Sequence, residues 1–284
     1  MASISKVGVI GAGAMGQGIA QVCAQSGFQV LLFDVDSKKI KSAISSISKN
    51  LDVAISKGKL SAEKKTQTLH NIRPILHLEN VTADLIIEAA VEKLEIKQQI
   101  FSDLEKTNSA DCVFASNTSS LSVSKIASAF DKPSRFLGLH FFNPAHLMPL
   151  VEVIAGDKTD GTLVREMTAF TKAIGKTPVV AKDSPGFIVN RVARHYYLEA
   201  LKALEENAAD AGTIDALLKS AGFKLGPFEL MDMIGNDVNY EVSRSLYEAF
   251  GNEPRFKPSE VQHRKVISGE LGKKTGKGFY EYKN

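Results

Sequence analysis

Short apolar runs rich in β-branched residues recur along the first 184 positions of the chain and alternate with segments of helical spacing. Runs of this length are typical of buried strands, whereas apolar residues three and four positions apart predict amphipathic helices. Strands that alternate with helices indicate a largely parallel sheet with helices on both faces, which is an α/β fold. The runs that predict strands are residues 6–10, 28–33, 84–89, 112–116, 135–139, 150–154 and 176–181.

The pattern becomes helical after the segment Asp183-Ser184-Pro185-Gly186, where proline and glycine interrupt it. Pro185 suits the first turn of a helix, because an N–H at that position would have no helical partner. We therefore predict an α/β domain over residues 1–184 and an all-helical C-terminal domain over residues 185–284. Its helices are expected near 187–204, 213–221, 228–250 (broken at Gly235) and 259–268, with no strand pattern before Gly278.

The composition is that of an ordinary soluble globular protein: of 284 residues, 44% are apolar and 24% are charged. The formal net charge of +3 is small and evenly spread, which argues against a nucleic acid as partner. Cys23 and Cys112 lie in apolar surroundings, so we expect buried, reduced thiols. We find no metal-ligand cluster, no secretory signal and no apolar run of the roughly 18 residues that a membrane span needs. We expect a cytoplasmic protein without a metal or a membrane partner.

A glycine-rich turn follows the first predicted strand. Its residues are Gly11, Ala12, Gly13, Ala14, Met15 and Gly16. In a nucleotide-binding turn the first glycine permits the tight bend, the second lets the backbone approach a pyrophosphate, and the third lets the helix pack on the strand. The N-terminus of the following helix then offers N–H groups to the phosphates. The alternative is a structural glycine turn in some other α/β fold.

An acidic residue completes this pattern at the end of the second strand run. Asp34 lies 21 residues after Gly13, close to the ~20 expected of an acid that binds the ribose hydroxyls. A carboxylate at this position also repels a 2′-phosphate, which favours NAD over NADP. The strands, the glycine turn, the helix and the acid together predict a Rossmann-like domain with NAD as its cofactor.

Residues 37–69 form a long polar segment with helical spacing, much longer than the ~12 residues that an ordinary crossover needs. We interpret the segment as a helical extension of the N-terminal domain. It is either a solvated helical face or a cationic arm for the anionic part of a substrate. Its lysines include Lys49, Lys57, Lys59, Lys64 and Lys65.

Polar side chains follow the strands predicted at 84–89 and 112–116. Open α/β sheets bind ligands at the carboxyl ends of their strands, so these side chains are site candidates by position. They are Glu92, Lys97, Asn117 and Ser119. For Ser119, a role as the N-cap of the next helix is an equally good interpretation.

One histidine and one glutamate supply the candidate chemistry. His140 stands at the end of the run 135–139, and Glu152 lies twelve residues later inside the run 150–154. Proton abstraction needs a base and a carboxylate that orients it. A glutamate within an apolar run is costly to bury without a partner. The alternative for His140 is a core histidine whose hydrogen bonds are satisfied within the fold.

Seven segments, spread over nearly the whole chain, match one family in the family's own order. They are Gly11 to Gly16, Ser116 to Ser120, Gly138 to Pro144, Leu150 to Val153, Asp183 to Arg191, Gly226 to Leu230 and Lys274 to Tyr280. In these segments the chain resembles the L-3-hydroxyacyl-CoA dehydrogenases, in the short soluble form often called 3-hydroxybutyryl-CoA dehydrogenase.

The resemblance implies roles for individual residues. His140 is similar to the family's catalytic base, and Glu152 is similar to the carboxylate that orients this base. Ser119 and Asn190 resemble the polar pair that positions the substrate oxygen, and Asp34 resembles the acid on the adenosine ribose. Further NAD contacts are implied for Glu92, Lys97, Ser119, Asn143 and Lys274, and contacts with coenzyme A for Asn50 and Lys57.

The implied reaction is the reversible NAD-dependent oxidation of an L-3-hydroxyacyl-CoA, such as 3-hydroxybutyryl-CoA, to the 3-ketoacyl-CoA. The resemblance also implies that the helical domain closes on the substrate and supports a homodimer. His146 and Pro149 stand where many short members have proline and lysine, and Met148 to Glu152 is closer to multifunctional fatty-acid oxidation proteins. Acyl-chain preference therefore stays open. Two other classes fit part of the pattern: a dehydrogenase of hydroxy or sugar acids without coenzyme A, and a non-enzymatic NAD-binding protein.

Overall fold

The structure, a computed structural model, describes residues 4–282. The chain divides into two compact units, Met1–Ser184 (unit 1) and Pro185–Asn284 (unit 2). The boundary falls in the segment where proline and glycine interrupt the apolar pattern of the sequence. Each unit has a hydrophobic core of its own.

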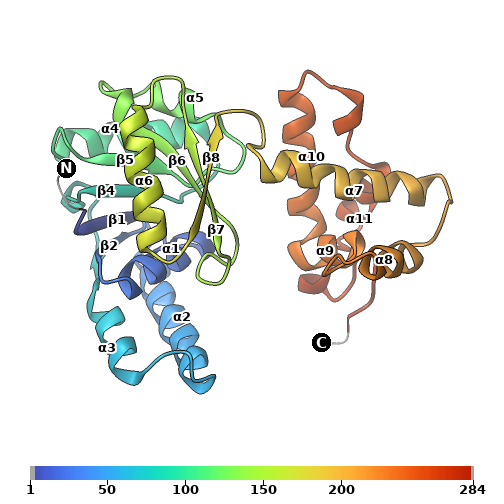
Figure 1. Ribbon diagram of the computed structural model, residues 1–284, viewed down its shortest axis with the longest axis horizontal. Coiled ribbons are helices and arrows are strands. Elements are labelled where there is room, and N and C mark those ends of the chain that lie inside the picture. The colour runs from blue at the N-terminus through green and yellow to red at the C-terminus, as the bar shows by residue number, and fades with distance from the viewer. Residues whose placement is uncertain (1–3, 283–284) are drawn as a thin grey trace. The chain divides into compact units, whose positions relative to one another are not determined.

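Unit 1 is built on an eight-stranded sheet with the order β3-β2-β1-β4-β5-β6-β7-β8 (Figure 1). The strands are β1 (Lys6–Ile10), β2 (Gln29–Phe33), β3 (Ile72–Ile75), β4 (Leu85–Glu88), β5 (Val113–Ser116), β6 (Phe136–Phe141), β7 (Leu150–Ala155) and β8 (Thr177–Lys182). Strands β1 to β6 pair in parallel, β7 runs antiparallel to β6, and β8 runs parallel to β7. The largely parallel sheet predicted from the sequence is confirmed.

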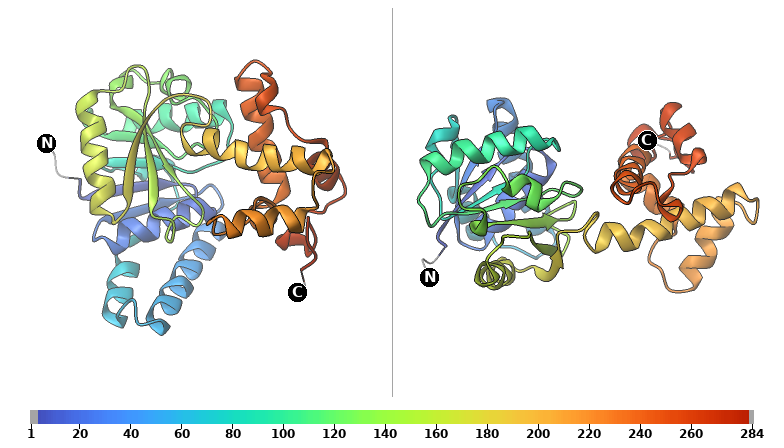
Figure 2. Two further views of the ribbon diagram at one scale, coloured as in Figure 1. Left: turned by 45° about the vertical axis from the view of Figure 1, so that its right-hand side comes forward. Right: turned by 90° about the horizontal axis from the view of Figure 1, so that it is seen from above.

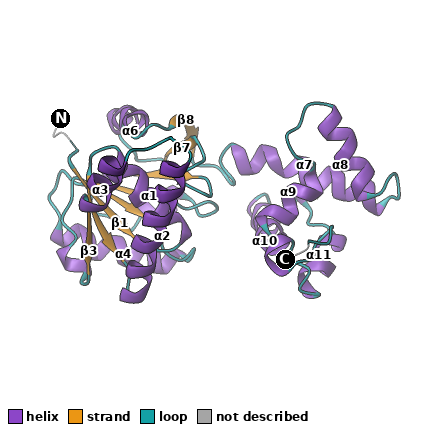
Figure 3. Cartoon of the chain, turned by 90° about the horizontal axis from the view of Figure 1, so that it is seen from below, coloured by secondary structure: helices purple, strands orange, loops and turns teal. Residues whose placement is uncertain are grey.

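Helices cover both faces of this sheet, as Figure 3 shows. They are α1 (Ala14–Gln25), α2 (Ser37–Ser56), α3 (Ala62–His70), α4 (Leu94–Thr107), α5 (Val123–Ala127) and α6 (Gly161–Ala173). On one face, α1, α2 and α6 bury side chains such as Ile19, Ile47 and Met167 against alternate residues of the strands. Because most strands are covered on both faces, they are continuous apolar runs in the sequence.

The opposite face of the sheet is filled by aromatic rings. Helix α4 supplies one phenylalanine, the strands supply two, and the segment after α5 supplies one; their ring centroids lie 4.9 to 6.2 Å apart in tilted or edge-on arrangements. Such arrangements are the favoured ones for aromatic pairs. The four rings are Phe101, Phe114, Phe130 and Phe136.

Residues 37–69, predicted as one helical extension, form two helices. Asp36 caps α2 by accepting a hydrogen bond from the N–H of Lys38, and Ser61 caps α3 by accepting one from Lys64. The two helices pack side by side and project from the sheet as a hairpin (Figures 1 and 2). The serine before the second helix is the local signal of the break that the apolar spacing alone does not reveal.

Strand β3 was not predicted from the sequence. It lies at the edge of the sheet, where Arg73 and Pro74 are exposed and only Ile72 and Ile75 are buried. An edge strand buries less surface and tolerates a proline, so it leaves no continuous apolar run. The prediction was also short at β6, which continues through His140 to Phe141 and therefore places the histidine within a strand.

Unit 2 is helical, as predicted. Its helices are α7 (Val189–Glu205), α8 (Ala211–Ser220), α9 (Pro227–Ile234), α10 (Asn236–Ala249) and α11 (Glu260–Ile267). Gly235 separates α9 from α10 with a φ of 106°, which glycine adopts readily. The helix expected near 187–204 begins at Val189, and Pro185 does not lie in its first turn: turns occupy 185–188, with Gly186 and Phe187 both at positive φ. Among residues 4–282, no helix is long and apolar enough to cross a membrane.

A buried aspartate ties the C-terminal segment to the helices of unit 2. Asp232 is 1% exposed. Its carboxylate accepts hydrogen bonds of 2.8–3.0 Å from the N–H groups of Phe279 and Tyr280, the hydroxyl of Tyr282 and the amide of Asn236. The sequence at Gly278, which has a strand pattern, therefore does not form a regular strand. The Asp232 carboxylate and isolated β-bridges fix this segment instead.

We expect Asp232→Ala to lower the free energy of unfolding of unit 2 by about 3 kcal/mol, since charge-assisted hydrogen bonds are lost and their donors stay buried. Hydrogen exchange of the α9 and α10 amides in the full chain measures this. Glu206→Ala, at an exposed side chain 3.9 Å from Lys202, is the control and should leave exchange unchanged. Unaltered exchange in Asp232→Ala would show that other contacts hold the segment.

Candidate active site

His140 and Glu152 face each other across two neighbouring strands. The antiparallel register of β6 and β7 pairs the two residues directly. His140 Nδ1 lies 2.7 Å from Glu152 Oε2, and the two residues are 5% and 0% exposed. The twelve-residue spacing in the sequence is therefore a cross-strand pair closed by the loop 142–149. Since Nδ1 is engaged by the carboxylate, proton exchange with a substrate would take place at Nε2.

The neighbouring strand fixes the backbone around this histidine. Asn117 follows β5, and its side-chain oxygen accepts a hydrogen bond of 2.8 Å from the N–H of Phe141. The loop beyond β6 is held by the ammonium of Lys176, which donates to the carbonyl of Met148 at 2.8 Å. Asn143, a predicted NAD contact, lies exposed in this loop.

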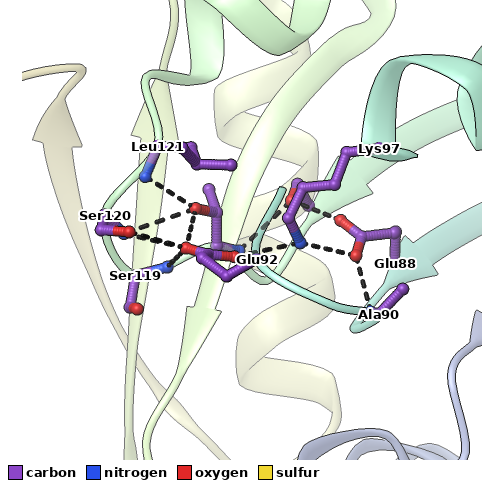
Figure 4. Close-up of polar contacts among 9 residues, drawn as sticks. Glu88, Ala90, Glu92, Lys97, Ser119, Ser120 and Leu121 are labelled. Atoms are coloured by element: carbon purple, nitrogen blue, oxygen red, sulfur yellow. Dashed lines mark hydrogen bonds and ion pairs between the residues drawn. The ribbon is translucent and has the colours of Figure 1, made fainter. Parts of the chain in front are cut away.

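Glu92 accepts several hydrogen bonds from the polar segment that follows β5 (Figure 4). Its carboxylate accepts hydrogen bonds from the hydroxyl of Thr118, the N–H of Ser119, and both the N–H and hydroxyl of Ser120. Burial opposes ionisation of Glu92, but the charge of Lys97 and these hydrogen bonds outweigh it, so the pKa of Glu92 is lowered. The Ser119 side chain points away from Glu92 in Figure 4.

Ser119 does not cap the next helix. The N-cap of α5 is Ser122, whose side chain accepts from the N–H of Lys125. Asp183 also accepts bonds from Ser122 and from the N–H groups of Val123 and Ser124, which fixes the start of this helix. The N-cap interpretation of Ser119 is thus wrong, and its position beyond β5 keeps it a site candidate.

Lys97, another predicted NAD contact, is buried with 1% exposed. Its ammonium lies 2.6 Å from Glu88 and 3.2 Å from Glu92. The sequence interpretation missed Glu88, which it counted as part of an apolar strand. A glutamate inside such a run was a signal of a buried partner here, as it was at Glu152. The role of Lys97 as an NAD contact stays a prediction.

The glycine turn after β1 has the geometry of a dinucleotide cradle. Gly11 adopts a φ of 103°, and a side-chain carbon on Gly16 would collide with the carbonyl oxygen of Gly11. A side-chain carbon on Gly13, in contrast, would meet no atom within 4 Å. Asp34 accepts a hydrogen bond of 2.8 Å from the N–H of Ala12, so the acid is held beside the turn. Open space at Gly13 and an adjacent acid fit a dinucleotide.

The residues with an implied coenzyme A contact lie on the α2–α3 hairpin. The amide of Asn50 donates to Gln21 of α1 at 3.2 Å, which holds α2 against α1. Lys57 ends α2 and is exposed. Lys65 lies 2.6 Å from Asp52, so its charge is already paired. The exposed lysine is the better candidate for an anion.

Two further predicted site residues belong to unit 2. Asn190 lies in the first turn of α7. Lys274 binds both carboxylate oxygens of Asp237, at 2.6 and 2.7 Å. Among residues 4–282, no group of three or more His, Cys, Asp or Glu residues has a geometry that would hold a metal ion.

The fold of unit 1 and its glycine turn are those of a dinucleotide-binding domain, and comparison with known proteins gives the family. The family model for the 3-hydroxyacyl-CoA dehydrogenase NAD binding domain matches residues 6–184. The model for the C-terminal domain of the same family matches residues 186–282. The chain belongs to the 3-hydroxyacyl-CoA dehydrogenase family, and its cofactor is NAD. The resemblance stated from the sequence is confirmed.

Individual relatives cover the chain from end to end. A protein of Escherichia coli named 3-hydroxyadipyl-CoA dehydrogenase is 46% identical over 285 residues. The alignment covers 100% of this chain and 60% of the length of that protein. The 3-hydroxybutyryl-CoA dehydrogenase of Bradyrhizobium diazoefficiens is 41% identical over 99% of this chain and 97% of its own length. The crystal structure of (S)-3-hydroxybutyryl-CoA dehydrogenase from Ralstonia eutropha gives a TM-score of 0.95 at 37% identity, with 99% of this chain and 100% of that chain covered.

Proposed function

We propose that this protein catalyses the reversible, NAD-dependent interconversion of an L-3-hydroxyacyl-CoA and the corresponding 3-ketoacyl-CoA. The observation that carries the proposal is the buried His140–Glu152 pair, on the same sheet as the nucleotide-binding glycine turn. A protein that only binds NAD has no need of a base oriented by a carboxylate. Family membership supports the acyl-CoA class of substrate.

In the oxidative direction, His140 accepts the proton of the substrate's 3-hydroxyl group at Nε2. Glu152, bonded to Nδ1, fixes the tautomer and stabilises the imidazolium that forms. Bound NAD supplies the acceptor for the hydride that leaves C3. We assign Ser119 to the substrate oxygen. In the reductive direction, the His140 imidazolium returns the proton to that oxygen.

The test of this function is the oxidation of NADH, followed by its absorbance, with acetoacetyl-CoA in one reaction and free acetoacetate in another. Turnover of the thioester alone supports the proposal. Equal turnover of the free acid would favour a dehydrogenase of small hydroxy acids, and no turnover of either would favour a non-enzymatic role. Relatives are named for both 3-hydroxyadipyl-CoA and 3-hydroxybutyryl-CoA, so both substrates belong in the oxidative assay.

We propose that the exposed Lys57 binds the anionic part of coenzyme A. Lys57→Ala is then expected to raise KM for acetoacetyl-CoA by roughly fivefold, because one exposed ion pair contributes at most about 1 kcal/mol, and to leave kcat unchanged. Lys65→Ala is the matched control on the same hairpin, since Asp52 already pairs that charge. Equal changes in KM for the two variants would exclude a specific role of Lys57.

Asp34 is proposed to bind the adenosine ribose of NAD. Asp34→Asn keeps an oxygen that can accept from Ala12 but removes the charge. We expect KM for NADH to rise roughly tenfold, since a charged hydrogen bond of about 1.5–3 kcal/mol is weakened, and the preference over NADPH to fall. Asp36→Asn, at the N-cap of α2, should leave both cofactor constants unchanged. An unchanged preference for NADH would place cofactor selection elsewhere.

We propose that unit 2 also supports a homodimer. Among the large apolar side chains of unit 2, Phe228 and Met231 lie in its core, each 0% exposed. Leu217, Phe223 and Met233 are instead 50% to 68% exposed. Exposed apolar side chains that gather into one contiguous patch commonly mark a protein–protein interface. The mass of the protein in solution tests this proposal: a monomer would contradict it.

A further inference from the structure

Glu88 is the most deeply placed member of a charged cluster at the carboxyl end of β4. It is 0% exposed. Its carboxylate accepts three hydrogen bonds of 2.6 Å each, from the ammonium of Lys97, the N–H of Ala90 and the hydroxyl of Ser116. The register pairs Glu88 with Ser116 on the next strand. A carboxylate with this set of donors is fully satisfied without water.

Lys97 connects this carboxylate to a second one. Its ammonium lies between Glu88 and Glu92. A buried ammonium needs a charged partner, and Glu88 is the one that is fully buried with it. Glu92 is less enclosed, with 36% of its side chain exposed. Glu88, Lys97 and Glu92 therefore form a chain of charges that leads outward from the core of unit 1 (Figure 4).

The outer end of this chain of charges fixes the backbone at Ser119. Glu92 receives the N–H groups of Ser119 and Ser120 at 3.0 and 3.2 Å. These two bonds set the orientation of the peptide groups, and therefore the direction of the Cα–Cβ bond that carries the Ser119 hydroxyl. If Glu92 lost its bond to Lys97, its carboxylate would keep only its hydrogen bonds to Thr118, Ser119 and Ser120.

We propose that Glu88 is a positioning residue that acts through Lys97 and Glu92 to direct the hydroxyl of Ser119. This inference rests on the proposed function, in which Ser119 binds the substrate oxygen. Hydrogen-bonded groups act on a reaction when they hold a contacting group in its productive geometry. Glu88 itself contacts neither substrate nor cofactor.

The alternative to the positioning role is that the buried ion pair only stabilises the fold. The two roles predict different kcat values for the double variant Glu88→Gln/Lys97→Met. It removes both buried charges at similar volume, a replacement that commonly leaves stability near that of the parent. A structural role therefore predicts a Tm and a kcat near wild type. The positioning role predicts a Tm near wild type with a lower kcat, because Glu92 has lost the cation that holds it.

The experiment measures the double variant with and without Ser119→Ala. We expect Ser119→Ala to lower kcat for acetoacetyl-CoA about tenfold in the wild-type background and to have almost no effect in the double variant, because coupled residues are not additive. Amide hydrogen exchange at Ser119 and Ser120 should be faster in the double variant. Gln98→Ala, whose side chain bonds instead to Lys125 and Ser128, is the control on the same helix.

Equal effects of Ser119→Ala in the two backgrounds, or unchanged exchange at Ser119, would overturn the positioning role. A single variant at Lys97 leaves Glu88 buried without its charged partner, and a single variant at Glu88 leaves Lys97 with Glu92 alone. The stability that either variant loses therefore does not test the positioning of Ser119. Failure of the proposed function has a different signature. In that case the wild-type protein does not oxidise NADH with acetoacetyl-CoA, and the exchange measurement still tests whether Glu88 and Lys97 order Ser119.

Discussion

His140→Ala is expected to lower kcat for the reduction of acetoacetyl-CoA by about 10²–10⁴-fold, the usual contribution of general acid–base catalysis. The substitution removes the group that donates the proton, while the glycine turn and Asp34 stay in place. The Kd for NADH should therefore remain near its wild-type value. Steady-state kinetics give the first quantity, and titration of NADH fluorescence gives the second.

Glu152→Gln is the matched variant for this prediction. It keeps the size of the side chain but removes the charge that stabilises the imidazolium, so kcat should also fall by orders of magnitude. The two residues act as one unit, and the double variant should be no slower than His140→Ala alone. A near-normal kcat in His140→Ala would refute its assignment as the base. Multiplying losses in the double variant would show that Glu152 acts independently of His140.

The sequence predicts most of unit 1 because its strands are buried on both faces. Strands β4 and β5 are apolar except at their last residues, Glu88 and Ser116, so their burial is visible without any knowledge of their neighbours. Edge strand β3 was not predicted, because Arg73 and Pro74 are exposed and interrupt its apolar pattern. The conformation of the C-terminal segment was not predicted for another reason. Its N–H groups donate hydrogen bonds to Asp232, which lies more than 40 residues earlier in the chain.

In the candidate site, too, residues could be predicted from the local sequence, whereas their contacts with distant residues could not. The His140–Glu152 pair could be proposed from residue types and an expected strand, but its cross-strand register depends on the loop that joins β6 to β7. Glu92 and Lys97 were predicted as site residues from their position after a strand and from the family resemblance. Their connection to Glu88 rests on contacts between a strand, a loop and a helix, which no local pattern in the sequence predicts.

Gly13→Val is expected to raise the Kd for NADH by roughly 100-fold while leaving Tm unchanged. Gly13 has a φ of −70°, which any residue adopts, and a side-chain carbon there would meet no protein atom within 4 Å. The protein therefore leaves space for a side-chain carbon at this position. The need for a glycine comes from the pyrophosphate, whose charge-assisted hydrogen bonds of about 1.5–3 kcal/mol require close approach of the backbone. Fluorescence titration and thermal unfolding of the same samples test both halves of the prediction.

Gly16→Ala is the matched variant, because the structure assigns this glycine the opposite property. A side-chain carbon at Gly16 would collide with the carbonyl oxygen of Gly11, so α1 would have to move away from β1. For Gly16→Ala we expect a clear fall in Tm together with weaker NADH binding. Gly13→Val, in contrast, should weaken NADH binding without lowering Tm. Normal NADH binding by Gly13→Val would mean that the pyrophosphate does not approach this turn, and the cofactor site in unit 1 would have to be placed elsewhere.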